Sequence, residues 1–307
     1  FSIFAALTIN FFIFRILPGD PIRLLFRDPR IPEEYIASLR RRFGLDQPLI
    51  NQYFLYLLNT LRGDLGISYV FRKPVIEIVF PALLNSVMLA GTGYLLAIPP
   101  GILIGILSSW KRGKLSSNLL LGLSLMLYSL PTFWLGGLMI VTFAVFLKIF
   151  PTSGMVSYAF QTNLLSSLTD FLWHLALPAI TYALLTIGQY ALIMRGAMLE
   201  TITEDYIVTA KAKGLTEWQV IRRHAFKNSI IPVVAITAIN LGFIAGGAIQ
   251  TETVFSWPGV GLLIYQSLQL RDYPILQGAF LILTLSVIIA NFLADIIYGF
   301  LDPRIQS

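Results

Sequence analysis

The chain has 307 residues, of which 56% are apolar and only 12% are charged, and its mean hydropathy is +0.75. Soluble domains average about 25% charged residues, so this composition excludes a soluble enzyme, a disordered tail and a disulfide scaffold. The chain has no cysteine and only two histidines, which excludes Cys-ligated zinc, iron–sulfur clusters and thiol chemistry. The net charge of +6 is typical of orientation signals in a membrane protein and does not indicate a nucleic-acid-binding surface.

Six apolar segments are predicted to cross a membrane. The first, 1–17, is apolar apart from Asn10 and Arg15. We expect it to be an anchor, because it has neither the basic start nor the small-residue cleavage site of a signal peptide. The others follow from windows without Asp, Glu, Lys or Arg, each longer than the roughly 20 residues that a spanning helix needs. The predicted spans are 1–17, 84–109, 118–147, 174–195, 230–252 and 275–299.

Basic residues are concentrated in alternate short loops, which sets the orientation. Loops 110–117 and 195–229 and the tail 300–307 are basic, whereas the outer loops 149–173 and 253–274 carry only Arg271. Both termini are therefore predicted to lie in the cytoplasm. The basic residues of the inner side are Lys111, Arg112, Lys114, Arg195, Lys211, Lys213, Arg222, Arg223, Lys227 and Arg304.

The segment 18–83 is predicted to lie outside, because a loop of more than ~60 residues largely escapes the charge rule. A turn at 17–21 ends the first span, acidic residues after Pro32 mark a helix start, and apolar residues over 49–61 repeat on one helical face. Three interpretations remain open: a cap packed on the ends of the spans, a lid over a pathway, or a docking surface for an external protein.

The inner loop 195–229 is predicted to form two short helices around a bend. Glu204 and Asp205 place acidic side chains at a helix start, and Gly214 ends the helix because it adopts positive φ readily. A second helix follows over 217–226. Such a protruding pair either docks in a groove of a partner protein or rests on lipid headgroups.

The stretch 205–215 (DYIVTAKAKGL), followed by WQVI at 218–221 and RHAFKN at 223–228, resembles the EAA loop of ABC importer permeases, in particular the dipeptide/oligopeptide/nickel branch. The general Glu-Ala-Ala pattern is matched only in part, since Val208, Thr209 and Ala210 occupy its place, but Gly214 is retained. Other blocks that resemble this branch are LPGDP at 17–21, RGDLG at 62–66, SLPTFWLG at 129–136, ETVFSWPGVG at 252–261, RDYP at 271–274 and LDPR at 301–304.

The resemblance implies an all-α membrane protein with the six-helix type I (MetI-like) importer permease fold. It implies an outer helical cap (18–83) between helices 1 and 2, a core (84–299) that includes the cytoplasmic loop 196–229, and a tail (300–307). It also implies a prokaryotic inner or plasma membrane, a second permease, two ATPase subunits and an extracytoplasmic solute-binding protein. Residues 207–215 would be the coupling helix, with Ala210 and Gly214 allowing close approach to an ATPase. The implied coupling residues are Glu204, Asp205, Tyr206, Thr209, Ala210, Lys211, Lys213, Gly214, Arg222 and His224.

The chain lacks the G-x-x-x-x-G-K-[S/T] loop that cradles nucleotide phosphates; its only Gly-Lys pair is Gly113-Lys114. We therefore expect no enzymatic activity and no cofactor in this chain, with ATP and Mg bound by the partner subunits. Their ATP-driven closure would switch the spans between inward-open and outward-open states, an alternating-access mechanism.

Polar residues inside spans are costly, and they either face a pathway or hydrogen-bond a neighbouring helix. The candidates for the pathway are Asn85, Tyr128, Tyr182, Thr186, Gln189, Asn240, Gln250 and Asn291. The glycine pairs Gly101/Gly105 and Gly242/Gly246 have the spacing of tight helix contacts, and Pro99-Pro100 and Pro131 are expected to kink their spans.

Two rival functions are considered. A carrier driven by an ion gradient needs charged or ion-coordinating groups near the middle of the membrane, and the five later windows have no Asp, Glu, Lys or Arg there. An intramembrane enzyme needs a catalytic group of residues, for which a chain without Cys and with few His offers little. Within the importer branch the substrate is open: peptide, oligosaccharide or nickel.

Overall fold

The computed structural model describes residues 2–16, 32–42, 44–110, 113–157, 163–244 and 248–301. Apart from one isolated bridge between Ile67 and Pro74, the regular elements in these ranges are helices. They are α1 (Ser2–Ile16), α3 (Glu33–Arg42), α4 (Leu49–Leu61), α5 (Val75–Trp110), α6 (Leu115–Ser129), α7 (Thr132–Met139), the π-helix η1 (Ile140–Phe146), α8 (Leu164–Ile202), α9 (Asp205–Ala212), α10 (Glu217–Val220), the π-helix η2 (Ile221–Ala225), α11 (Phe226–Ser229), α12 (Ile231–Ile244), α13 (Ile249–Phe255), α14 (Val260–Leu270) and α15 (Tyr273–Leu301).

Among the described residues, three helices are long and apolar enough to cross a membrane: α5, α8 and α15 over Tyr273–Phe292. Two bent pairs bring the number to five if each pair is one span, and α1 is a shorter apolar helix. The number of six spans therefore stays a prediction, as does the outer location of the segment assigned to the cap. This segment contains the helices α3 and α4, and the loop 195–229 contains the expected helix–bend–helix.

Helices α5 and α8 form the centre of the molecule and pack closely through two glycines. A Cβ atom added at Gly101 would lie 2.6 Å from the Cβ of Tyr190, and one added at Gly105 would lie 2.5 Å from the Cβ of Met194. Similarly, a Cβ at Gly242 of α12 would lie 2.6 Å from the Cβ of Ala290 on α15. The predicted small-residue contacts are confirmed at these three positions, and Gly246 lies outside the described residues.

The predicted span 118–147 is interrupted in the middle, as its expected kink at Pro131 suggests, but the interruption is larger than a kink. Helix α6 and the segment Thr132–Phe146 meet at an angle of 103°. Leu130, with ψ of 142°, is extended, as expected for a residue before proline, and Pro131 has no N–H to continue the helix. The kink expected at Pro131 is therefore a complete break. By contrast, α5 continues through Pro99 and Pro100 as one helix.

Several helices extend beyond the spans that the charge-free windows predict. Helix α5 begins at Val75, inside the segment assigned to the cap, because Pro74 and the first-turn acid Glu77 are helix-start signals. Helix α8 begins at Leu164, where Asn163 forms a capping box with Ser166. The region predicted as the outer loop 253–274 also contains the end of α13 and all of α14. In these places the charge-free window shows where a span can lie, but it does not show that the helix continues beyond a charged residue.

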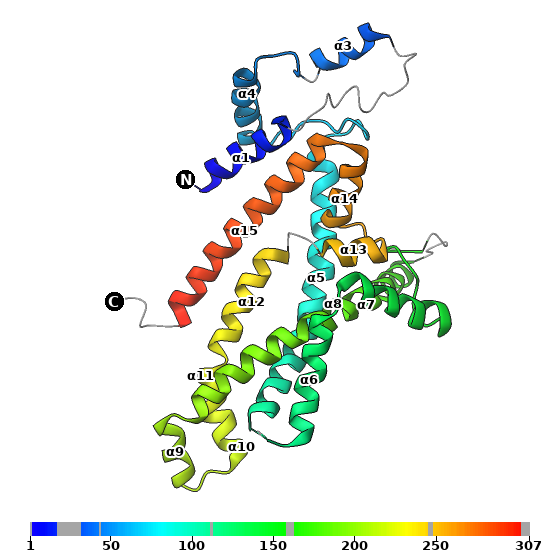
Figure 1. Ribbon diagram of the computed structural model, residues 1–307. Coiled ribbons are helices and arrows are strands. Elements are labelled where there is room, and N and C mark those ends of the chain that lie inside the picture. Colours follow the sequence, from blue (N-terminus) through cyan, green and yellow to red (C-terminus); the bar gives the residue numbers. More distant parts are fainter. Residues whose placement is uncertain are drawn as a thin grey trace.

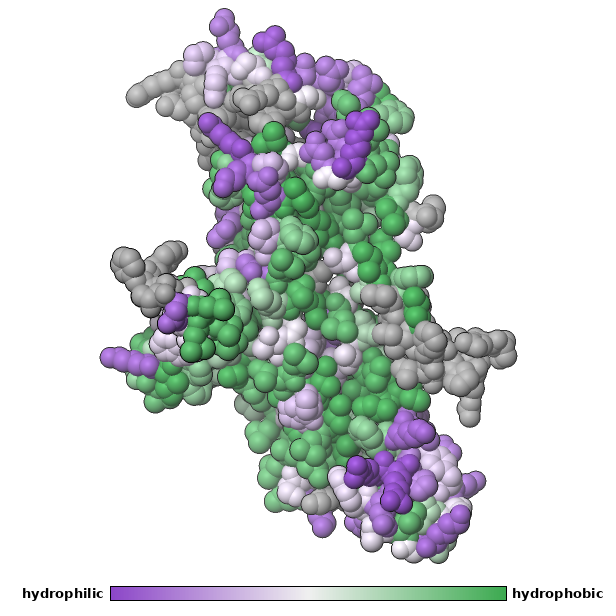
Figure 2. Space-filling model, turned by 180° about the vertical axis from the view of Figure 1, so that it is seen from behind, coloured by the Kyte–Doolittle hydropathy of each residue, from purple (hydrophilic) through white to green (hydrophobic). Residues whose placement is uncertain are grey.

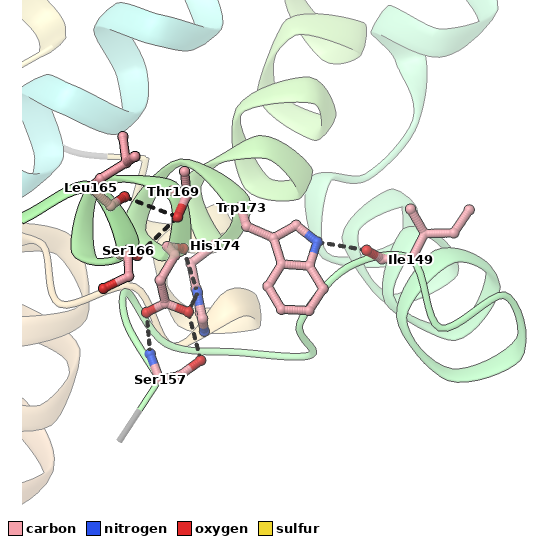
Figure 3. Close-up of polar contacts among 8 residues, drawn as sticks. Ile149, Ser157, Leu165, Ser166, Thr169, Trp173 and His174 are labelled. Atoms are coloured by element: carbon pink, nitrogen blue, oxygen red, sulfur yellow. Dashed lines mark hydrogen bonds and ion pairs between the residues drawn. The ribbon is translucent and has the colours of Figure 1, made fainter. Parts of the chain in front are cut away.

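The loop before α8 is fastened to that helix (Figure 3). Asp170 accepts hydrogen bonds from the backbone N–H and the hydroxyl of Ser157, both at 2.7 Å, and the indole N–H of Trp173 donates to the carbonyl of Ile149 at 2.6 Å. The imidazole Nδ1 of His174 lies 2.8 Å from the backbone carbonyl oxygen of Asp170. These bonds assign His174 a structural role.

The helices are arranged with the cap and the inner loop at opposite ends (Figure 1). Helices α3 and α4 lie at the top of the view, and α9 and α10 lie at the bottom. Figure 2 shows hydrophilic residues gathered at these two ends and mainly hydrophobic residues between them. This distribution is the one expected of a chain whose middle lies in a bilayer.

Candidate coupling and translocation site

The inner loop folds as a compact bent pair of helices. Glu204 is the N-cap residue of α9, the helix begins at Asp205, and Gly214 follows its end with a φ of +78°. The next helix, α10, begins with a capping box in which the Thr216 hydroxyl accepts from Gln219 N–H and the Gln219 side chain accepts from Thr216 N–H. The chain therefore reverses at Gly214, as predicted, although α9 covers Asp205–Ala212 and not 207–215.

One face of α9 belongs to the interior of the chain. Ile207 is fully buried and Ala210 is 4% exposed, and both pack in a cluster with Val220 and Ala225. The resemblance implies that Ala210 allows close approach of an ATPase. This expectation is wrong as regards its side chain, because the methyl group is turned toward the permease's own core.

The opposite face of α9 is exposed. Val208 is 59% exposed, and Trp218 of α10 is 64% exposed. The predicted coupling residues apart from Ala210 are also exposed, except that His224 is half-buried; they are Glu204, Asp205, Tyr206, Thr209, Lys211, Lys213, Gly214 and Arg222. This end of the molecule therefore exposes two large apolar side chains together with both acidic and basic residues.

The inner loop is braced against α5 and α11. The ammonium group of Lys211 lies 5.3 Å from the centroid of the Trp110 ring, a cation–π distance. The same indole donates a hydrogen bond to Glu217 at 3.1 Å. Asn228 donates to the Tyr206 hydroxyl at 2.7 Å. These contacts connect α9 and α10 to the end of α5, which no sequence pattern predicted.

Three of the predicted pathway residues lie in two hydrogen-bonded groups, one between α5 and α8 and one between α8 and α12. The Tyr182 hydroxyl donates to the hydroxyl of Tyr94 at 3.0 Å. The Asn240 amide donates to Gln189 at 3.3 Å and to the Tyr190 hydroxyl at 3.1 Å. These contacts join helices to one another, which is the alternative to a pathway role considered for polar residues in spans.

The remaining pathway candidates are spread over the structure. Thr186 donates to backbone carbonyls of its own helix. The Asn85 amide donates to the carbonyl of Pro258 at 2.9 Å, and the Asn85 carbonyl accepts from the Trp257 indole at 2.9 Å. Tyr128, Gln250 and Asn291 are exposed on the surface of this single chain.

A buried carboxylate, Glu252 of α13, was missed in the sequence. It is fully buried, accepts a hydrogen bond from the Ser86 hydroxyl at 2.7 Å and accepts a second from the Leu262 N–H at 3.1 Å. Added Cβ atoms at Gly259 and Gly261 would lie 2.4 Å and 2.8 Å from its Oε2. The motif at 252–261 therefore encloses a carboxylate that links α5, α13 and the start of α14. The sequence signal was an acid at the edge of a charge-free window, in the same motif as Gly259 and Gly261.

A second buried acid fastens the outer segment to the core. Asp272 is fully buried at the corner between α14 and α15. Its carboxylate accepts a hydrogen bond from the Ser68 hydroxyl and, at 3.1 Å each, hydrogen bonds from the N–H groups of Tyr69 and Val70.

Among the residues that the structure describes, no group of three or more His, Cys, Asp or Glu side chains is placed to hold a metal ion.

Comparison with known proteins identifies the family of this chain. Residues 101–307 match the family described as the binding-protein-dependent transport system inner membrane component. The chain belongs to this family of ABC importer permeases. It is 37% identical to the dipeptide transport system permease protein DppB of Escherichia coli (strain K12), with 99% of this chain and 95% of that protein covered. It is 36% identical, over the same shares of the two chains, to the di/tripeptide transport system permease protein DppB of Pseudomonas aeruginosa (strain UCBPP-PA14).

The fold of the permease is also similar to a solved one. A chain of the MetNI methionine ABC transporter, in an inward-facing conformation, superposes with a TM-score of 0.58 at 17% identity, covering 74% of this permease and 97% of that chain. The resemblance stated from the motifs and the type I importer permease fold are both confirmed.

Proposed function

We propose that this permease forms the translocation pathway of an ATP-driven importer for peptide-type substrates. Two similar permeases carry dipeptide and di/tripeptide in their names, and the similarity extends over 99% of the chain. A solute-binding protein would deliver the substrate at the cap end, a second, similar permease would complete the pathway, and two ATPase subunits would bind ATP and Mg at the opposite end. Both termini would lie in the cytoplasm. Oligosaccharide and nickel remain alternative substrates within this type of importer.

The exposed face of α9 is the observation that carries this proposal. It presents an apolar side chain, Val208, 59% exposed, beside Lys211 and Lys213 at the end of the molecule opposite the cap. An amphipathic helix with such a centre and rim fits a groove on a partner protein. Because Lys211 and Glu217 both contact Trp110, movement of a docked partner would reach α5, and through it the α5–α8 core.

The test is reconstitution of the permease with its ATPases, second permease and binding protein, followed by measurement of ATP-dependent dipeptide uptake. Val208→Asp places a carboxylate in the proposed interface, where its desolvation is unfavourable, and we expect uptake to fall about tenfold or more. Val208→Thr, of similar volume and uncharged, is the matched control and should keep most of the uptake. Unchanged uptake in Val208→Asp would contradict docking at α9.

The carrier alternative is tested with the permease alone. Vesicles that contain only this chain are given a proton or sodium gradient, and the account predicts no accumulation of substrate. Robust gradient-driven uptake would contradict the proposed dependence on ATPase subunits.

A further inference from the structure

Helix α4 of the cap exposes an apolar face. Four large side chains on this face follow one another at intervals of four, four and three residues, and between 46% and 78% of each is exposed: Ile50, Phe54, Leu58 and Leu61. The helix contains no Asp, Glu, Lys or Arg. A helix of a water-soluble protein turns such a face toward the core, whereas α4 turns it away from the rest of the chain.

The polar residues of α4 face the chain instead. Gln52 is only 9% exposed and donates a hydrogen bond to a backbone carbonyl at 2.7 Å. The hydroxyl of Tyr53 lies 2.7 Å from that of Thr8 on α1, and the hydroxyl of Tyr56 accepts a hydrogen bond from the Asn10 amide at 3.3 Å. Polar groups that face protein, with apolar groups outside, are typical of a helix surrounded by hydrocarbon.

Helix α3, in the same segment of the chain, has the opposite pattern. Its charged residues Glu34 and Arg41 are exposed, and its apolar residue Ile36 is 4% exposed. This is the pattern of a helix on the surface of a protein in water. The two helices of the cap therefore have side chains suited to different surroundings.

The contacts of α4 place it beside the outer end of a helix that is able to cross the membrane. Asn10, which contacts α4, also donates to the carbonyl of Gln277 on α15 at 2.9 Å. Thr60 of α4 and Leu281 of α15 line the same cavity. The apolar part of α15 begins at Tyr273, and Leu281 lies about 12 Å further along that helix. Helix α4 therefore lies alongside the first two turns of α15.

The apolar face of α4 adjoins the outward side of α1. Figure 1 shows the two helices side by side, and the rings of Phe12 and Tyr53 stack with centroids 5.9 Å apart. Ile9 and Ile13 of α1 are each more than half exposed. Because α1 is a predicted span, hydrocarbon is expected to cover these side chains, and the same layer would reach the face of α4.

We propose that α4 lies in the outer leaflet of the membrane, with its apolar face against lipid acyl chains, while α3 lies in water. The partner is the hydrocarbon of the bilayer, and no particular headgroup is required. The cap is then attached to the membrane itself as well as to the core of the permease. This inference does not rest on the proposed transport function.

The test is electron paramagnetic resonance of single spin labels in the assembly, reconstituted into phosphatidylcholine vesicles. The chain has no cysteine, so only the cysteines of the partner subunits must be replaced. Phe54→Cys and Leu58→Cys are the two reporters on α4, and Ser38→Cys, at an exposed position of α3, is the matched control. Collisions of each label are measured with oxygen, which dissolves in hydrocarbon, and with a water-soluble nickel chelate.

The ratio of oxygen to nickel accessibility should be about tenfold or more higher at both reporters than at the control, because a polar metal complex is excluded from hydrocarbon. Equal ratios at the reporters and the control would place the face in water, where a binding protein could cover it, and would overturn the proposal. Low accessibility to both reagents would also overturn it, because another protein, such as a second permease, would then cover the face. Dipeptide uptake by the labelled assemblies, measured in parallel, separates failure of this proposal from failure of the transport function.

Discussion

At the residue scale, the buried acid Glu252 best explains why the 252–261 motif has its composition. Its carboxylate connects residues that are far apart in the chain, since Ser86 precedes it by 166 positions. The two glycines of the motif leave the space that the carboxylate occupies. A charged group buried in this way is stable only while its hydrogen bonds are intact.

We expect Glu252→Gln to lower the stability of the permease by about 1.5–3 kcal/mol, because an NH2 group then faces backbone or hydroxyl donors. The measurement is thermal unfolding of the purified protein in detergent. Glu200→Gln, a change at an exposed acid on α8, is the control and should leave the unfolding temperature unchanged. Equal unfolding temperatures for the two variants would show that the carboxylate contributes no stability.

At the scale of elements, the apolar periodicity and the helix-ending residues Gly and Pro predict where helices lie. They predict poorly which surfaces the helices bury. The repeat over 49–61 and the glycine at 214 gave α4 and the end of α9. The same patterns could not tell that Ala210 faces the permease's own core, because this face is set by Val220 and Ala225 of the following helices. Likewise, Pro131 predicts a kink, but the 103° angle depends on how α6 and α7 pack against α8 and α13.

The bend after α9 is expected to be required for coupling ATP hydrolysis to transport. A Cβ atom at Gly214 would meet nothing within 4 Å, so the main cost of Gly214→Val is the φ of +78°, at least about 1–2 kcal/mol because a β-branched residue strongly disfavours positive φ. We expect the variant to assemble and hydrolyse ATP but to lose much of its ATP-driven uptake, measured as transported substrate per ATP. Ala212→Val, two residues earlier and also exposed, is the control. A normal transport ratio in Gly214→Val would contradict the need for this bend.

At the scale of the whole molecule, the distribution of basic residues predicts which end faces the cytoplasm. The chain has no cysteine, so single cysteines report on exposure without background. We expect Asp46→Cys, in the cap between α3 and α4, to react with an impermeant thiol reagent in intact cells. Lys114→Cys, in the loop between α5 and α6, should react only after the membrane is opened. Labelling of both variants, or of Lys114→Cys alone, in intact cells would contradict the orientation.

The central claim is that ATPase subunits drive this permease by binding to the exposed face of α9. The most direct measurement is cysteine cross-linking in the reconstituted assembly, with Val208→Cys as the reporter and Asp46→Cys as the control at the opposite end. The account predicts a covalent product between Val208→Cys and an ATPase subunit, whose yield changes when ATP is added, and no such product for Asp46→Cys. Cross-linking of Val208→Cys to lipid-phase reagents only, with no ATPase product under any nucleotide condition, would contradict it.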